Sequence, residues 1–333
     1  MRNLSVEYLR VVFISFIVLL HILWKDYGGL HVALGDNDVN TYVQLGLTNL
    51  VSLGVTGFIL ISGYYGVRLK INRIVSLWLQ TTMYALASAI AVYQFGGGGS
   101  LKSFIDAPLC LFDGGWWFVS DYVILMLFSP FLNDGLERMD KRALMFVILM
   151  LTFSMYGVQW FHARDASMPL LLFFNTYLVG RYIRLYPVKW LEKYKYLIFT
   201  LGLIALVSEP MALHYFGLDC KMKFAGGNFN FLILVVNIAL LMICNGHQKM
   251  GKGNLLTKNV LAVYLIHESG IGRKILHESV FRDDVQFNIA YILAIVAVVV
   301  VVCVVIEEIR KRLFHKLENQ MIQNIDSLLK LSF

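Results

Sequence analysis

An arginine and a histidine share one face of an apolar segment near the start of the chain. Between Arg10 and His21 only Ser15 is polar. If the segment is an α-helix, eleven steps of about 100° place His21 about 20° around the helix from Arg10 and about 16 Å along it. Glu7 lies about 60° from Arg10 and extends the stripe. Because ionisable residues inside an apolar helix are costly, these residues are candidates for a functional site.

These residue types suit acid–base chemistry on an anionic partner. Histidine is the usual general base near neutral pH. Arginine keeps its charge and binds anionic groups. A face that carries both suits a reaction that binds an anionic donor and removes a proton. The structural alternative is that Arg10 snorkels to the membrane interface while His21 caps the helix end.

A second candidate site follows a glycine-rich segment. Small residues at positions 54, 57, 63 and 66 allow helices to pack closely. The segment then ends in a basic cluster, Arg68, Lys70 and Arg73. Such a cluster could clamp the phosphates of a nucleotide-bearing cofactor. The alternative is that these cations only fix the orientation of the chain in a membrane.

Two further pairs of residues lie at the start of an apolar run or within one. Trp116 and Trp117 begin one run, where tryptophans either form an interfacial belt or wall an acceptor site. His267 and Glu268 interrupt another, and such a pair needs a partner or a cavity. No metal is expected, because no helix presents two metal ligands at i, i+4 spacing and the four cysteines lack ligand spacing.

The elements that position these residues are predicted to be membrane helices. Of 333 residues, 58% are hydrophobic and only 15% are charged, against about 25% charged in a soluble domain. The net charge of +7 does not indicate nucleic acid, because basic residues in membrane proteins mostly set orientation. The predicted fold is an all-α bundle of about ten transmembrane helices. Apolar runs of spanning length fall at 8–24, 41–65, 73–95, 116–132, 142–160, 168–186, 195–217, 228–245, 258–276 and 287–306.

The charges between these runs predict that both termini are cytoplasmic. With the N-terminus inside, 21 of the 29 Lys and Arg residues fall in inside segments, and the bias alternates through every loop. The predicted membrane domain covers residues 1–306. Residues 307–333 repeat apolar residues every four positions, which predicts a cytoplasmic amphipathic tail on the membrane face.

Four segments in order resemble acyltransferase family 3, which includes bacterial O-acetyltransferases of surface polysaccharides. They are Glu7-Tyr8-Leu9-Arg10 with His21, residues 58–64 with the basic cluster after them, Trp116-Trp117-Phe118 with residues 127–132, and Tyr264-Leu265-Ile266-His267. The resemblance covers residues 1 to about 310. It implies a multi-pass protein of the bacterial cytoplasmic (inner) membrane with a ten-helix core.

The resemblance also implies an activity. An acetyl group would move from acetyl-CoA to a hydroxyl of a cell-surface, nascent or lipid-linked glycan. His21 would be the catalytic histidine, with Arg10 and Glu7 as partners in its site. His21 would activate the hydroxyl or briefly take the acetyl group itself. Acetyl-CoA is a donor substrate, and no permanently bound cofactor is expected.

Substrate contacts follow from the same resemblance. Arg68, Lys70 and Arg73 would hold the phosphates of coenzyme A, although the tight basic pair of the family is loosened in this chain. Acceptor contacts are expected from Trp116, Trp117 and His267. The lipid bilayer is the other expected partner, and a homodimer is left open.

Two alternative functions stay open on the sequence. Intramembrane His, Glu and Arg also build proton relays, so the chain could be a transporter or exporter of a glycan or small molecule. Transporters often contain internal repeats, and we find no convincing repeat here. The second alternative is transfer of a larger acyl group, such as succinyl.

Overall fold

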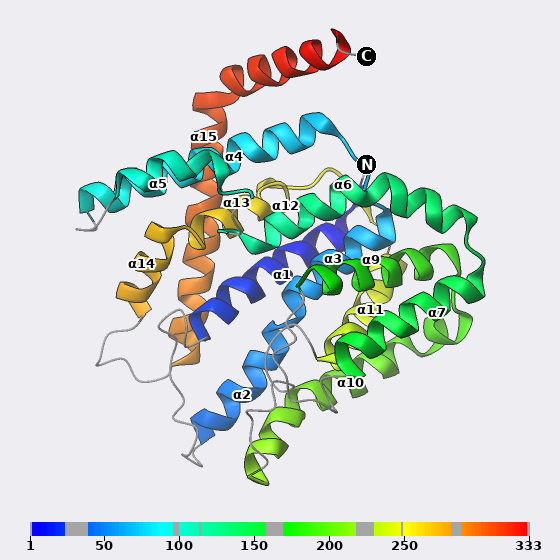
Figure 1. The fold of residues 1–333 in the computed structure, drawn as a ribbon. Helices are drawn as coiled ribbons and strands as arrows, with labels where there is room; N and C mark the ends of the chain where they lie inside the picture. Colours follow the sequence, from blue (N-terminus) through cyan, green and yellow to red (C-terminus); the bar gives the residue numbers. More distant parts are fainter. Residues whose placement is uncertain are drawn as a thin grey trace.

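The computed structural model is almost entirely helical, as the composition predicts (Figure 1). It describes residues 2–23, 39–95, 100–112, 115–157, 169–217, 230–247, 249–280 and 288–331, and the ends of several predicted spans lie outside them. Two short strands, β1 (Arg2–Asn3) and β2 (Met250–Gly251), pair antiparallel. The helices are α1 (Leu4–Leu23), α2 (Val39–Val51), α3 (Leu53–Tyr65), α4 (Ile71–Phe95), α5 (Leu101–Asp106), η2 (Ala107–Leu109), α6 (Trp117–Arg138), α7 (Lys141–Thr152), η3 (Phe153–Gly157), α9 (Pro169–Leu185), α10 (Lys189–Tyr215), α11 (Phe231–Gly246), α12 (Leu255–Lys258), α13 (Val260–His267), α14 (Gly270–Val280) and α15 (Ile289–Leu331).

The all-α fold is confirmed, and each of the ten predicted segments falls on helix. Among the described residues, five helical stretches are long and apolar enough to cross a membrane. They are Leu4–Leu23, Val39–Tyr65, Ile71–Phe95, Lys189–Tyr215 and Ile289–Ile325. The count of ten spans and the cytoplasmic location of both termini stay predictions.

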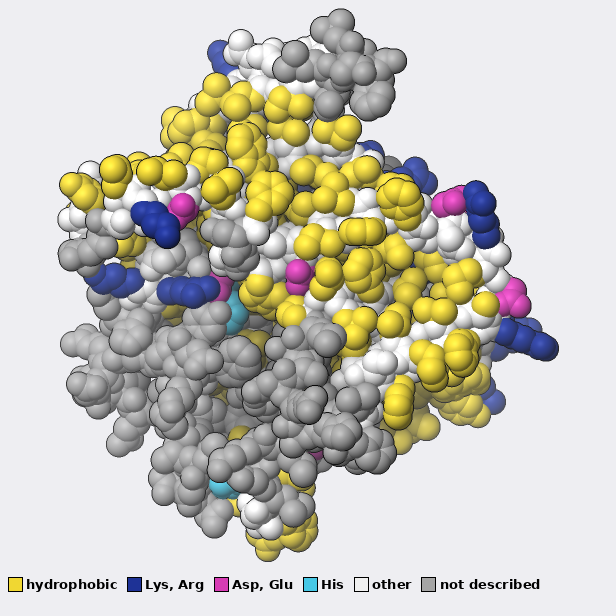
Figure 2. All heavy atoms as spheres, in the orientation of Figure 1, with side chains coloured by type: hydrophobic (Ala, Val, Ile, Leu, Met, Phe, Trp, Pro, Cys, Tyr) yellow, Lys and Arg dark blue, Asp and Glu magenta, His cyan; other side chains and the backbone are white. Residues whose placement is uncertain are grey.

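The surface of the bundle carries many apolar side chains. Hydrophobic side chains cover much of the face in Figure 2, and the Lys and Arg side chains visible there gather toward the edges. On α10, Leu197, Leu201 and Ile204 are exposed, and α15 exposes Val298 and Val301 in the same way. Exposed apolar surface of this extent is typical of helices that face lipid.

Glycines bring α3 against its neighbours at backbone distance. A Cβ atom on Gly63 would lie 2.4 Å from the Tyr177 carbonyl oxygen of α9, and one on Gly180 would lie 2.6 Å from the Leu60 carbonyl oxygen. On another face, a Cβ on Gly57 would lie 2.3 Å from the Phe13 ring of α1. The close packing predicted from the small residues of this segment is therefore confirmed, and it holds α1 beside α3.

The ninth predicted segment is broken rather than continuous. α13 ends at His267, and α14 begins at Gly270. The chain turns so tightly that a Cβ on Gly272 would lie 2.2 Å from the Ile266 carbonyl oxygen. The break places Glu268 at the C-terminal cap of α13. Its carboxylate is thus directed by the turn as well as by the helix.

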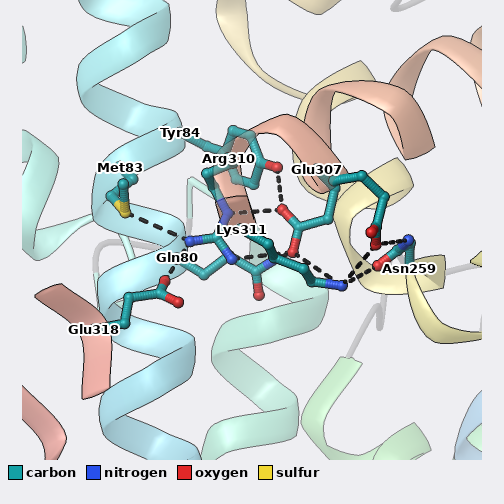
Figure 3. A network of polar contacts seen from close by, with 9 residues as sticks. Gln80, Met83, Tyr84, Asn259, Glu307, Arg310, Lys311 and Glu318 are labelled. Atoms are coloured by element: carbon teal, nitrogen blue, oxygen red, sulfur yellow. Dashed lines mark hydrogen bonds and ion pairs between the residues drawn. The ribbon is translucent and has the colours of Figure 1, made fainter. Parts of the chain in front are cut away.

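The last helix continues through the predicted tail boundary at residue 307. In Figure 1 the final part of α15 bends away from the direction of its first part. Glu307, only 2% exposed, accepts hydrogen bonds from Gln80 and Tyr84 of α4 and is paired with Arg310 (Figure 3). Lys311 of α15 reaches Asn259, which precedes α13. This network fixes α15 against α4 and α13.

Candidate active site

His21 lies near the C-terminal end of α1. There it contacts residues at the break between α13 and α14. Its Nδ1 atom lies 2.9 Å from Oε2 of Glu268 and 3.0 Å from Nε2 of His267. The other ring nitrogen of His267, Nδ1, lies 2.6 Å from the Val263 carbonyl oxygen. Glu268 and His267 are 3% and 2% exposed. A buried cluster therefore forms between two segments that are distant in the sequence.

These contacts define which nitrogen of each imidazole carries the proton. A neutral His267 that donates Nδ1–H to the Val263 carbonyl has a lone pair at Nε2. His21 Nδ1 thus faces two acceptors, the Glu268 carboxylate and His267 Nε2, and must itself be the donor. A neutral His21 then has its lone pair at Nε2. This is the tautomer of a histidine that acts as a general base while a carboxylate orients it.

The carboxylate that orients His21 has its own cation. Arg273 of α14 pairs through Nη2 with Oε1 of Glu268, and its Nε donates to the Glu268 carbonyl oxygen at 3.1 Å. A buried carboxylate needs such a partner to stay ionised. Each oxygen of Glu268 thus has a separate role: Oε1 contacts arginine and Oε2 contacts His21.

Arg10 and Glu7 lie elsewhere, in the wall of a cavity of about 810 Å³. Arg10 Nη1 donates to Glu7 Oε1 at 2.8 Å. Ile14 and Ile17 continue this wall along α1, and Ile17 lies one helical turn, about 6 Å, before His21. Glu7 and Arg10 of the predicted stripe therefore line the cavity, whereas His21 lies in the buried cluster with Glu268 and His267.

One end of the cavity is polar, because several helix ends on one side of the bundle supply charged and amide side chains. We call it the polar end, and its residues are Asn3, Tyr65, Arg73, Arg184, Asn245 and Lys258. Hydrogen bonds show that the ends of α3, α9 and α11 meet here: Arg184 and Asn245 both donate to the Tyr64 hydroxyl, at 3.3 and 2.7 Å.

The predicted basic cluster contributes only Arg73 to the cavity wall. Arg68 and Lys70 are exposed and are not among its lining residues. The other cations of the polar end, Arg184 and Lys258, come from α9 and α12. Arg73, Arg184 and Lys258 thus line one cavity although they are distant in the sequence.

The opposite end of the cavity is aromatic. Phe58, Phe118 and Tyr264 line it, and the Phe118 ring lies 6.3 Å from Phe58 and 5.6 Å from Tyr264 between centroids. Tyr264 is also 6.0 Å from the His267 ring. Neither tryptophan of the predicted acceptor wall lines this cavity. Its aromatic end is connected to His21 through Tyr264 and His267.

Comparison with known protein families identifies the family of this chain. A family model described as an acyltransferase domain, acyltransferase family 3, matches residues 3–308. The chain belongs to this family. Neither curated proteins nor solved structures gave a match. The resemblance seen in the sequence is therefore confirmed over nearly the whole chain, and the protein is a membrane acyltransferase.

The acyltransferase also brings together three groups of the kind that bind metals. One ligand atom each from His21, His267 and Glu268 lies within 4.8 Å of the others. His21 comes from α1, and His267 and Glu268 come from the end of α13. The spacing of residues within one helix cannot predict such a group. That no metal takes part stays a prediction, and the tautomers above account for the same contacts without an ion.

Three residues of this acyltransferase site carried no assigned role in the sequence. Glu268 was visible as a costly charge in an apolar run, which is the signal that could have identified it. Arg184 and Lys258 look like orientation charges in the sequence. Only the fold shows that both face a cavity.

Proposed function

We propose that the protein transfers an acetyl group from acetyl-CoA to a hydroxyl of a cell-surface or lipid-linked glycan, in a bacterial cytoplasmic membrane. The contact between His21 and Glu268, beside a cavity with cations at one end, carries the proposal. Membership of an acyltransferase family favours an enzyme over a transporter.

The donor binds in the cavity with its phosphates at the polar end. Arg73, Arg184 and Lys258 supply positive charge there, and Arg10 is partly neutralised by its contact with Glu7. The thioester arm extends along α1 past Ile14 and Ile17. This direction brings the acyl group toward His21. The predicted cytoplasmic N-terminus puts the polar end, to which Asn3 belongs, on the cytoplasmic side.

Transfer then needs one proton to move and one bond to exchange. His21 Nε2 accepts the proton of the acceptor hydroxyl while that oxygen attacks the thioester carbonyl carbon. The C–S bond breaks, and the protonated His21 returns the proton to the leaving thiolate. Glu268 stabilises the imidazolium that forms between these steps.

The acceptor approaches from the end of the bundle where His21 lies. α6 begins there with Trp117, whose ring packs 6.1 Å from Phe118. The indole N–H of Trp116 is buried and has no hydrogen-bond partner among the described residues. A hydroxyl of a sugar would satisfy this donor, which supports Trp116 as an acceptor contact.

Transfer of radiolabelled acetyl groups tests the proposal. Purified protein in lipid nanodiscs is incubated with acetyl-CoA and a membrane extract that contains glycan acceptors. Wild type and the control His315→Ala, an exposed tail histidine, should label the acceptor fraction, whereas His21→Ala should not. Equal labelling by His21→Ala would refute the assignment.

Two further measurements define the substrates. Glycan from a strain that lacks the protein should have lost O-acetyl groups, which names the acceptor. Succinyl-CoA in place of acetyl-CoA tests the larger acyl group, and we expect weaker transfer because Phe58, Phe118 and Tyr264 narrow the end of the cavity.

A further inference from the structure

An exposed apolar stripe on α15 continues past the point where the helix becomes charged. Its members are Val298, Val302, Val305, Ile309, Leu313 and Leu317, all of them exposed. Steps of about 100° place the six side chains within about 120° of one another around the helix. The first three precede Glu307 and lie on the lipid-facing side of the apolar part. The last three therefore extend this lipid-facing side into the charged part of α15.

The extension lies beyond the thickness of a membrane core. About 20 helical residues cross the hydrocarbon region, so a span that starts at Ile289, the first residue of α15, has crossed it before Ile309. Leu313 and Leu317 are nevertheless 71% and 53% exposed. On a straight helix that stands upright in the membrane, both leucines would project into water.

The bend of α15 gives these leucines another position. Arg310 pairs with Glu318 (Figure 3). On a straight helix, Cα atoms eight residues apart are about 12 Å distant, so this contact fits the bend seen in Figure 1. Arg310 also pairs with the buried Glu307, which fixes the bend to the bundle. A helix that turns at the end of its span can lie along the membrane surface.

The same side of the helix carries two exposed cations, Arg312 and Lys316. They lie about 60° and 20° around the helix from Ile309. Within the described part of the chain, neither takes part in an ion pair. The carboxylates nearby are paired with other cations: Glu307 and Glu318 with Arg310, and Glu308 with Lys311. This side of α15 is therefore both apolar and positively charged.

We call the side formed by Ile309, Arg312, Leu313, Lys316 and Leu317 the tail face. A lipid surface matches both of its properties. Leucines enter the boundary of the acyl chains, while long cationic side chains reach the phosphates above them. The continuity with the lipid-facing side of the span favours lipid over a second protein as the partner. We infer that the tail face binds the membrane surface and that Arg312 and Lys316 contact the headgroups of anionic phospholipids.

Limited proteolysis of the full-length protein in nanodiscs tests this contact. The discs contain phosphatidylcholine alone or phosphatidylcholine with phosphatidylglycerol. Chymotrypsin cleavage after Phe314 is measured relative to cleavage after Phe216, an exposed residue at the end of α10, in the same digest. Two cations near an anionic surface should slow the relative cleavage after Phe314 about 10-fold or more in the anionic discs.

Variants with altered charge identify the residues that respond to the lipid. Arg312→Gln with Lys316→Gln should be cleaved at the same relative rate in both discs. Arg312→Lys with Lys316→Arg keeps the charges and should keep the protection. Arg68→Gln with Lys70→Gln removes two exposed cations from outside α15 and should also keep it.

Three results would overturn the inference. Wild type could be cleaved equally in both discs, or the protection could persist in Arg312→Gln with Lys316→Gln. Protection that depends on two copies per disc, and not on lipid charge, would assign the tail face to contact between copies. Acetyl transfer does not enter any of these measurements, so their outcome is independent of the proposed function.

Discussion

Oε2 of Glu268 lies 2.9 Å from Nδ1 of His21, and Oε1 of the same carboxylate contacts Arg273. The carboxylate thus connects the proposed base on α1 to a cation on α14, across the break between α13 and α14. Glu268 and the Nε2 lone pair of His267 both face Nδ1 of His21, so Nδ1 carries the proton and Nε2 is the basic nitrogen. The orientation of the proposed base, His21, therefore depends on Glu268, Arg273 and His267 as well.

Glu268→Gln should lower kcat by about 10²-fold or more, which is the usual contribution of an oriented general base. The amide has no charge with which to stabilise the imidazolium of His21. Because Glu268 does not line the cavity, the KM for acetyl-CoA should stay within a factor of two or so. Steady-state transfer rates measure both constants. A raised KM with unchanged kcat would instead make Glu268 a donor contact.

Substitution of cations should distinguish those that line the cavity from Arg68 and Lys70, which do not. Arg73→Ala and Lys258→Ala each remove a charge from the polar end and should raise the KM for acetyl-CoA roughly 10-fold. Arg68→Ala and Lys70→Ala serve as matched controls, because neither residue lines the cavity. The donor-dependent rise in melting temperature gives an independent readout. Larger effects at positions 68 and 70 would instead support Arg68 and Lys70 as the phosphate contacts.

Because α3 and α9 approach so closely, a single methyl group added between them should lower the stability of the protein. Gly63→Ala would place Cβ 2.4 Å from the Tyr177 carbonyl oxygen, so backbone has to move and the protein should lose about 1–3 kcal/mol of stability. Gly135→Ala is the matched control, since its Cβ would meet nothing within 4 Å. Thermal melts in detergent compare the two. Equal melting temperatures would show that the α3–α9 contact is looser than described.

Periodicity and charge predict local features well, and distant contacts poorly. The stripe on α1 was visible because Arg10 and His21 lie on one helix, where geometry follows from spacing. The meeting of His21 with Glu268 depends on how α13 packs against α1, and no local pattern encodes it. Arg184 and Lys258 illustrate the same limit: their sequence context resembles any basic helix end, and only tertiary packing directs them into a cavity.

The contacts of His21, His267 and Glu268 predict the response to metals. If these groups act as base and orienting partners, a chelator should leave acetyl transfer unchanged. Added Zn²⁺ at micromolar concentration should inhibit, because the three ligand atoms lie within 4.8 Å of one another and suit a bound ion. A chelator should then restore activity. Loss of transfer on chelation of the untreated protein would show instead that an ion belongs to the site.

The buried network around Glu307 predicts a cost to stability that depends on both of its charges. Glu307 and Arg310 are 3% and 10% exposed in their side chains, so Glu307→Ala leaves Arg310 buried beside Glu318 with one partner fewer. Removing one member of a buried pair costs about 3–5 kcal/mol, and thermal melts should show it. Glu308→Ala, at a neighbouring and more exposed carboxylate, should cost less than about 1 kcal/mol.

A double variant distinguishes charge from packing in the same network. Glu307→Gln with Arg310→Met removes both buried charges while it keeps most of the volume, so its loss of stability should be smaller than that of Glu307→Ala. Gln80 both lines the cavity and donates to Glu307. Glu307→Ala should therefore also raise the KM for acetyl-CoA, because Gln80 is no longer held in the cavity wall. Unchanged donor kinetics in a destabilised Glu307→Ala would confine the network to holding α15 against α4.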